Sequence, residues 1–399
     1  MISSKVKVLS LISIIIVLIA FLFKKYTDDR LRQKLDHVLS GLLLAEKKAT
    51  PLASQTRIAI GFGGCLDYVL DAMEFVKKLN LTAPDEPEHY DSVESKEQLS
   101  KLFAYFFRHG AAAERFVSNE TLFNEVIKGA EGMASLRKAM GGNAPQMARR
   151  LSMEGATVLL ATHLSEELLK TLPGTIKGER YARLQKLQNL LAKTKSSTKI
   201  HFELASFTDQ SLIQEIIETV VVYADSLGMN EQELPNLVSQ LTGDNVSLIS
   251  DPYPRTATVL DQMRSVYRVL KNTKKNYGHR RLTRLHIHTL AYQAILTSKE
   301  SHWKNTMSAA AKASLTAIRY VCGSDSIDTM KVRLIMDDSF STSRSEFGKR
   351  IMFTEDKPVS CWEEEDYQIC VAPVLVCTAV LQTAGGGDNI SSAGLLYQI

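Results

Sequence analysis

The sequence lacks a Walker A loop, a Cys-x-x-Cys pair and an internal repeat over its 399 residues. Without the first, nothing indicates a P-loop nucleotide site. Without the second, or any His/Cys ligand spacing, no metal centre of that kind is indicated. The five cysteines are few and odd in number, which argues against a full disulfide framework, although one bond among the last four stays open. The net charge of +4 is too small to indicate a nucleic-acid partner, and no nucleic-acid-binding motif is present.

The length fits two or three domains or one large one, and a hydrophobic content of 45% is enough for a sizeable core. Apolar runs predict strands at residues 56–64, 156–164 and 198–206, and residues 371–388 indicate a strand, a loop and a helix start. Helical patterns occupy about 68–140, 181–195 and 209–229, and residues 282–296 indicate a strand running into a helix. This alternation predicts an α/β protein with a mostly parallel central sheet.

The N-terminus carries a long apolar run, VLSLISIIIVLIAFLF at residues 8–23, with lysines on both sides. Residues 1–27 are therefore predicted to be an uncleaved signal anchor, which would contact a membrane, or a cleaved signal peptide; a buried core helix is the third alternative. Residues 28–54 indicate an amphipathic helical linker. Sequons at Asn80, Asn119 and Asn245 fit a lumenal body. We expect the protein to be in the secretory pathway, most of all in the endoplasmic reticulum, or to be secreted if the signal is cleaved.

Near the C-terminus, the segment TAGGGDNISSAGL at residues 383–395 places Asp388 directly after three glycines and before a helix-like stretch. Glycines allow a sharp turn and expose backbone N–H groups, and a helix N-terminus favours a bound anion. An aspartate at the edge of such a loop can accept a proton from an attacking hydroxyl. A plain helix-capping turn is the alternative from these residues alone.

Four further segments precede this Gly-x-Gly-Asp pattern. They are IGFGGCLDYVLD (60–71), MGGNAPQMA (140–148), KIHFELAS (199–206) with a His-x-Glu pattern, and SLGMNEQEL (226–234) with Asn-x-x-Glu. All five, in this order, resemble the ADP-dependent glucokinases of animals, in the ADP-dependent sugar kinase branch of the ribokinase-like superfamily. The resemblance implies a kinase domain over 55–399. It would comprise a large Rossmann-like α/β part and a smaller α/β lid from parts of about 70–200, after the N-terminal hydrophobic helix.

The resemblance also implies a reaction, in which ADP phosphorylates the 6-hydroxyl of glucose to give glucose 6-phosphate and AMP. Asp388 matches the catalytic base of the family. The backbone N–H groups expected to hold the transferring phosphoryl group are those of Gly385, Gly386 and Gly387. The residues expected to contact glucose hydroxyls are Asp67, Gly142 and Asn143.

The same resemblance implies Mg²⁺ near the nucleotide phosphates, for which carboxylates are suitable hard ligands. The metal-site residues it suggests are Glu203, Glu233 and Asp388. Asn230 is expected to orient that site and His288 to contact the nucleotide, whereas a polar strand face packed under a helix is the alternative for His288. His201 is expected to be a structural histidine.

The main alternative is a catalytically silent sugar or nucleotide sensor on the same fold, followed by a kinase for another hexose. The chain is short for an animal member of the family, which suggests missing segments between about 165 and 200 or 335 and 362. Asn389 lies in a further sequon, but a glycan there would block the glycine loop, so it is expected to be unmodified. A monomer is expected.

Overall fold

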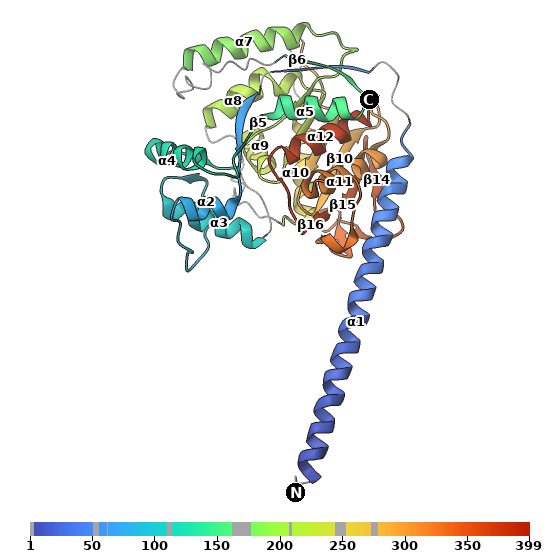
Figure 1. Ribbon diagram of the computed structural model, residues 1–399. Helices are drawn as coiled ribbons and strands as arrows, with labels where there is room; N and C mark the ends of the chain where they lie inside the picture. The colour runs from blue at the N-terminus through green and yellow to red at the C-terminus, as the bar shows by residue number, and fades with distance from the viewer. Residues whose placement is uncertain are drawn as a thin grey trace.

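The computed structural model describes residues 4–50, 56–61, 63–109, 114–161, 177–206, 210–243, 253–272 and 278–399. Its centre is a six-stranded sheet in the order β14-β15-β10-β9-β8-β7 (Figure 1). The strands are β7 (His201–Glu203), β8 (Ser226–Asn230), β9 (Arg284–His288), β10 (Tyr292–Ser298), β14 (Ser360–Glu364) and β15 (Tyr367–Pro373). Pairing is parallel from β7 to β9 and antiparallel elsewhere, so the parallel part of this α/β fold lies on the β7 side.

Two sequence predictions within this sheet are wrong. Residues 282–296 form the hairpin β9–β10 and not a strand followed by a helix. The Thr289 hydroxyl closes its tight turn, because it accepts hydrogen bonds from the backbone of Ala291 and Tyr292. Residues 209–229 are not one helix either, since the helix ends at Thr219 and Ser226 begins β8. Both stretches are apolar and short, so their periodicity did not separate buried strand from buried helix.

Helices cover both faces of the sheet. One face packs on α8 (Gln210–Thr219), α9 (Glu233–Thr242) and α10 (Thr256–Lys271), which share the largest apolar cluster with β8, β9, β10 and β15. The other face packs on α11 (Thr306–Cys322) and α12 (Gly386–Leu396), with α5 (Asn143–Met153) beside α12. The site described below lies at the start of α12, where it meets β7–β9.

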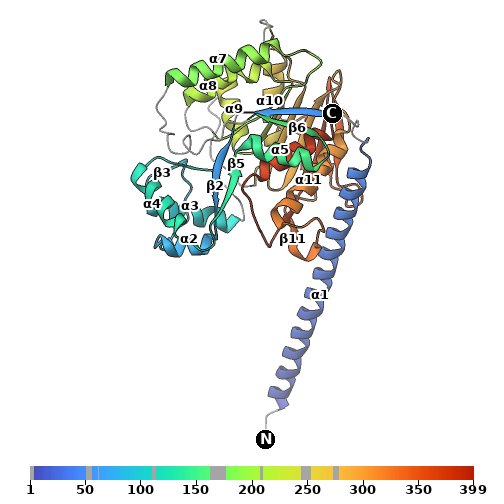
Figure 2. The same ribbon diagram turned by 45° about the horizontal axis from the view of Figure 1, so that its top comes forward.

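A smaller group of elements stands beside the large body, as Figures 1 and 2 show. Its strands are β2 (Cys65–Val69), β3 (Ser92–Val93), β4 (Phe116–Val117) and β5 (Arg137–Gly141), and its helices are α2 (Ala72–Lys78), α3 (Lys96–His109) and α4 (Glu120–Glu131). It has its own small apolar cluster around Leu102, Phe106 and Leu122. This group is a smaller α/β unit, as the sequence led us to expect, and its role as a lid stays a prediction.

Short pairs of strands complete the fold. They are β1 (Arg57–Gly61) with β6 (Thr157–Ala161), β11 (Val332–Leu334) with β16 (Leu375–Cys377), and β12 (Ser339–Ser341) with β13 (Arg350–Met352). The helix α7 (Lys177–Lys193) and the 3-10 turns η1 (Val221–Tyr223) and η2 (Thr329–Lys331) lie between longer elements. The sequon at Asn245 lies outside the described residues.

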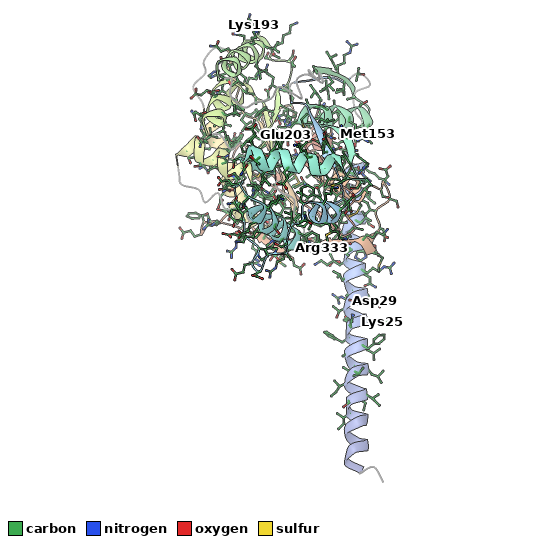
Figure 3. The ribbon with its side chains drawn as sticks, turned by 60° about the vertical axis from the view of Figure 1, so that its left-hand side comes forward. Lys25, Asp29, Met153, Lys193, Glu203 and Arg333 are labelled. Carbon is green, nitrogen blue, oxygen red and sulfur yellow. A yellow bond between two sulfur atoms is a disulfide. The ribbon has the colours of Figure 1, made fainter. Side chains whose placement is uncertain are left out.

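The first helix, α1 (Ser4–Lys47), is continuous, and its two halves have different surroundings. Leu35, Val38 and Leu42 recur at helical spacing and are buried against α11 and the sheet. The preceding turns project from the body with exposed apolar side chains, and Figure 3 marks Lys25 and Asp29 on this part. Within the described residues, no helix combines the length and apolar character needed to cross a membrane. The segment 28–54 is therefore partly core and not simply a linker.

Two disulfides join the last four cysteines, Cys322 to Cys377 and Cys361 to Cys370. All five cysteines are described, and Cys65 is free. The sequence left one bond among the last four cysteines open, and the structure has two. Cys361 and Cys370 are direct partners across β14 and β15, a proximity that the spacing of cysteines along the chain does not reveal.

Candidate functional site

The glycine loop turns the chain into α12. Gly385 caps the helix with a φ of 72°, a left-handed conformation that favours glycine. A side chain on Gly387 would meet the buried ring of His288, with Cβ 2.8 Å from Cε1. A Cβ on Gly386, by contrast, would meet no described atom within 4 Å. The helix start is therefore packed at Gly387 and leaves space for a side chain at Gly386, although Gly386 itself is buried and its N–H donates to the carbonyl oxygen of Thr383 at 2.9 Å. The first turn of a helix is its positive end.

Asp388 lies in the first turn of α12 and is half-buried. Burial raises its pKa to about 7, and the negative charges of Glu203, Glu114 and Asp67 act in the same direction. The neighbouring His288 opposes this shift. Four carboxylates from distant parts of the chain thus gather near one another, so Asp388 can both hold and release a proton near neutral pH.

The residues expected to bind sugar come together beside this loop. Asp67 on β2 faces β5, and a Cβ on Gly141 would lie 2.0 Å from its Oδ1, so the carboxylate needs glycine there. Gly142 has a φ of 87° and starts α5, whose first residue is Asn143. Nδ2 of Asn143 donates to the carbonyl oxygen of Leu204, 3.2 Å away, just after β7. The small group and the large sheet therefore meet at these residues.

Glu203, labelled in Figure 3, is buried at the end of β7 and surrounded by donors. Its Oε2 lies 3.0 Å from Nε2 of His201, and its Oε1 lies 3.0 Å from Nε2 of His288. Ser391 of α12 donates its hydroxyl to the same carboxylate, which occupies the space left by Gly228. Burial opposes the charge, but the bonds from His201 and His288 outweigh it and hold the pKa of Glu203 well below its usual range.

The Asn-x-x-Glu segment forms a reciprocal cap at the start of α9. The backbone N–H of Asn230 donates to Glu233 at 2.8 Å, and its side-chain amide donates at 3.0 Å. Oδ1 of Asn230 accepts from the backbone of Gln232 and Glu233. Burial is the main reason that the pKa of Glu233 is raised to about 8; the charges of Glu203 and Glu114 act in the same direction, and His288 and the Asn230 backbone oppose them. Asn230 thus fixes the orientation of a carboxylate beside the acidic group.

No three His, Cys, Asp or Glu side chains within the described residues form a ready-made metal site. Mg²⁺ usually keeps several waters and takes one or two protein carboxylates together with substrate phosphates. Burial is the main cause of the raised pKa values of Asp388 and Glu233, and neighbouring carboxylates raise both pKa values as well. This donor set fits a hydrated divalent cation. Glu203 is the least available ligand, because both of its oxygens already accept hydrogen bonds.

His201 and His288 are held by the protein itself. His201 contacts the hydroxyl of Ser226 at 2.9 Å as well as Glu203. The ring of His288 is 8% exposed and lies under the glycine loop, so the geometry matches the alternative of a polar strand face packed under a helix. Nucleotide contact by His288 stays a prediction.

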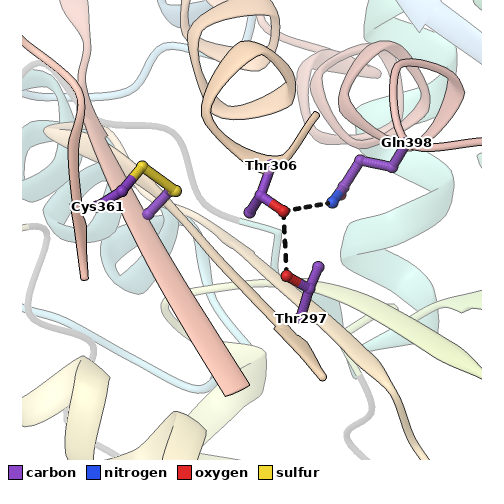
Figure 4. Close-up of a disulfide and its surroundings, with 5 residues drawn as sticks. Thr297, Thr306, Cys361 and Gln398 are labelled. Carbon is purple, nitrogen blue, oxygen red and sulfur yellow. Dashed lines mark hydrogen bonds between the residues drawn. A yellow bond between two sulfur atoms is a disulfide. The ribbon is translucent and has the colours of Figure 1, made fainter. Parts of the chain in front are cut away.

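The same strand face continues under α12 as a buried polar row. Arg284 is fully buried and donates to Gln398 at 2.6 Å and to Ser226 at 3.0 Å. Gln398 also donates to Thr306, whose hydroxyl lies 3.0 Å from that of Thr297, as Figure 4 shows beside a disulfide. The C-terminal end of the chain is therefore anchored to the sheet by specific hydrogen bonds.

Sequence reasoning missed several residues that shape the site. Ser391 and Gly228 both contact Glu203, yet a lone serine or glycine gives no signal without the fold. Glu114 adds charge from the small group. Asn389 is 2% exposed and donates to the carbonyl oxygen of Gly385 at 2.8 Å, so the folded protein has no room for a glycan there. Its orientation depends on Arg150, which donates to its Oδ1.

The fold defines a structural class, an α/β protein with a central sheet and a smaller α/β group. The chain resembles a solved structure of a hypothetical ADP-dependent phosphofructokinase from Pyrococcus horikoshii, with a TM-score of 0.51 and 14% identity. The match covers 87% of this chain and 98% of that one. The expected fold class is thereby confirmed.

The pattern of the ADP-specific phosphofructokinase/glucokinase conserved region matches residues 56–180 and 175–397. The chain therefore belongs to this family of ADP-dependent sugar kinases, which are phosphotransferases acting on an alcohol group.

Two relatives are similar over most of this chain. An ADP-dependent glucokinase of Bos taurus is 27% identical over 87% of this chain and 85% of its own length. A probable ADP-dependent glucokinase of Caenorhabditis elegans is 25% identical over 97% and 94%. The bovine alignment spans 428 positions, more than the 399 residues of this chain, so internal segments of that relative are absent here. Their expected positions, between about 165 and 200 or 335 and 362, stay a prediction.

Proposed function

We propose that this protein uses ADP to phosphorylate the 6-hydroxyl of D-glucose, producing glucose 6-phosphate and AMP. The observation that carries the proposal is Asp388, a half-buried aspartate with a pKa raised to about 7, next to a helix N-terminus. Membership of an ADP-dependent sugar kinase family supports the donor and the reaction class. The two glucokinase relatives favour glucose over other hexoses.

In this mechanism Asp388 accepts the proton of the sugar hydroxyl as its oxygen attacks the β-phosphorus of ADP. The bond from that phosphorus to the oxygen of the AMP leaving group breaks, and AMP departs with the electron pair. The N–H groups of Gly385, Gly386 and Gly387 are the proposed donors to the transferring phosphoryl group, which would enter the space beside Gly386. The N–H of Gly386 donates to the carbonyl oxygen of Thr383 at 2.9 Å and would have to exchange that partner for the phosphoryl oxygen. The fixed orientation of these donors lowers the cost of reorganisation in the transition state.

The sugar is held, in this proposal, by Asp67, Gly142 and Asn143. Asp67 accepts hydrogen bonds from two hydroxyls, and the free carbonyl side of the Asn143 amide accepts another. Because Asp67 belongs to the small group and Asp388 to the large body, closure of the lid brings the hydroxyl to its base. Closure also excludes water, which would otherwise hydrolyse ADP.

Mg²⁺ bound to the nucleotide would offset the negative charge that develops on its phosphates. Glu233 and Asp388 are the proposed direct or water-mediated ligands, whereas Glu203 contributes charge and holds its histidines. Asn230 fixes Glu233 by the two hydrogen bonds already described. His288 supports the loop from below and lies close enough to influence bound phosphates by charge.

The exposed apolar turns of α1 support a further proposal, that the N-terminal segment directs the chain into the secretory pathway and anchors it to the endoplasmic reticulum membrane unless cleaved. Two disulfides favour such an oxidising compartment. A monomer is the proposed assembly. Protease protection of the catalytic body in sealed microsomes tests the topology; full digestion without detergent would contradict a lumenal body.

The test of function measures the sugar phosphate and the nucleotide formed by the full-length chain with Mg²⁺, ADP or ATP, and glucose or fructose 6-phosphate. Transfer from ADP releases AMP, whereas transfer from ATP would release ADP, so both nucleotide products are measured. We expect AMP and glucose 6-phosphate from ADP with glucose, and no turnover with ATP. Turnover with fructose 6-phosphate alone would replace the proposed acceptor. Glucose binding without any turnover would favour the silent sensor instead, with Asp388 as a helix cap.

A further inference from the structure

A chain of polar contacts leads away from the glycine loop through Asn389. The carbonyl oxygen of Gly385 accepts two hydrogen bonds from Asn389, one from its backbone N–H at 3.1 Å and one from its side-chain Nδ2 at 2.8 Å. Oδ1 of Asn389 accepts from Nε of Arg150 at 2.9 Å. Since arginine can only donate, this contact fixes the amide so that Nδ2 faces Gly385.

Arg150 is itself held by a relay of alternating charges. Its Nη1 lies 3.3 Å from Oε1 of Glu154, and Oε2 of Glu154 lies 2.8 Å from Nζ of Lys312. Lys312 also pairs with Oε1 of Glu46 at 3.2 Å. These four side chains are 10–13% exposed, so the screening that weakens surface pairs is reduced here.

The relay crosses four helices that lie side by side. Glu46 belongs to the last turn of α1, Lys312 to α11, and Arg150 to α5, while Asn389 is on α12. The helix α12 packs against both α5 and α11, as Figures 1 and 2 show. Removing one member leaves its neighbour charged and poorly hydrated, so the neighbour must move or recruit water.

We propose that Asn389 and Arg150 are positioning residues for phosphoryl transfer. The relay that ends at Arg150 sets the orientation of the Asn389 side chain. Asn389 in turn fixes the carbonyl oxygen of Gly385, and this contact holds the glycine loop and Asp388 in place. The inference rests on the proposed function for its kinetic consequence. None of the relay residues touches the sugar or the reacting atoms. Their effect is therefore on the turnover step and not on sugar binding.

The kinetic test compares Asn389→Ala, Arg150→Ala and the double variant in the full-length chain. We expect each single variant to lower kcat by between about 10-fold and 100-fold, because a small displacement of positioned groups has this effect. The KM for glucose should stay within about 3-fold of the parent value, because these residues do not contact the sugar and its binding is unchanged. The double variant should lose no more than the worse single variant, because Arg150 acts through Asn389.

Arg264→Ala is the matched control. Arg264 is a buried arginine of similar exposure, 10% against 13% for Arg150, and it binds Glu364 on the opposite face of the sheet. This variant should lower stability while leaving kcat per folded molecule unchanged. Arg150→Lys, which keeps the charge but loses the Nε geometry, should fall between the parent and Arg150→Ala. Folded fractions from circular dichroism normalise every rate.

Amide hydrogen exchange gives a second readout that needs no turnover. The amides of residues 386–389 should exchange faster in Asn389→Ala than in the parent, and should be unchanged in Arg264→Ala. If the parent chain has no kinase activity, the proposed function fails and exchange alone decides the inference. Unchanged kcat in an active, folded Asn389→Ala, or unchanged exchange at 386–389, overturns the positioning role.

Discussion

Gly386 and Gly387 offer a matched perturbation at the start of α12, because one position is open and its neighbour is closed. Alanine at 386 meets no described atom within 4 Å, so it fits the helix. It should raise the free energy of unfolding by about 0.4–1 kcal/mol, since alanine has less freedom in the unfolded chain. Alanine at 387 would push on the ring of His288, which Glu203 holds in place. An overpacked contact of this kind lowers the free energy of unfolding by about 1–3 kcal/mol.

Activity should change in the opposite order to stability. If the open space at Gly386 receives the phosphoryl group, the added methyl excludes it, and kcat/KM should fall by about 100-fold or more, as when one oxyanion donor is removed. Chemical denaturation measures stability, and AMP release with glucose measures activity. A stabilised Gly386→Ala enzyme with full activity would refute the assignment of this space. A Gly387→Ala protein with the same free energy of unfolding as the parent would refute the packing argument.

Three further predictions concern single groups. Asp388→Asn should lower kcat by about 10²–10⁴-fold while glucose binding, measured by calorimetry, persists; parent-like kcat would remove the base role. Burial opposes the ionisation of Glu364, but hydrogen bonds from Arg264 and nearby donors outweigh burial and lower its pKa to about 2. The ionised side chain therefore stabilises the folded protein above its unfolded pKa, and this contribution is lost as the pH falls towards 2. Because 27% of this side chain is exposed, Glu364→Gln should lower the free energy of unfolding by only about 1–2 kcal/mol at pH 7, and should not lower it at pH 2. A difference between variant and parent that does not change with pH would contradict this. Replacing Cys322 and Cys377 by alanine removes the disulfide that closes a loop of 55 residues, and should lower the free energy of unfolding by about 4 kcal/mol. A reduced parent protein as stable as the oxidised one would contradict this.

The alternation of helices and strands was predictable in part: β1, β6, β7 and β9 lie in predicted strands, whereas β3, β4 and β5 lie in a region with helical patterns. The type of β10 was not predictable either. Leu285 and Ile287 alternate with polar residues as a strand should, whereas the following apolar run from Tyr292 fits either type of element. What decides it is the tight turn at Thr289 and the neighbouring β15, which pairs with β10 over its whole length. Such a partner lies far along the sequence, so local periodicity contains no trace of it.

The candidate site was predictable where one short motif carries its own backbone geometry. Asp388 after three glycines and the Asn230–Glu233 cap are examples, since turn and cap chemistry act within a few residues. Contacts between distant segments were not predictable in this way. Ser391 reaches Glu203 across 188 residues, and Arg150 reaches Asn389 across 239. Those pairs follow from how α12 packs on the sheet and on α5.

The continuous helix α1 makes residues 4–47 a stiff rod and not a flexible tether. From Ile12 to Lys34 it extends about 33 Å at the usual rise of 1.5 Å per residue, and its last turns are embedded beside α11. Any binding partner that holds the N-terminal end of this helix therefore also fixes the orientation of the whole kinase body. The candidate site at the start of α12 would then face a constant direction, so access of sugar and nucleotide would depend on the orientation in which the helix is held.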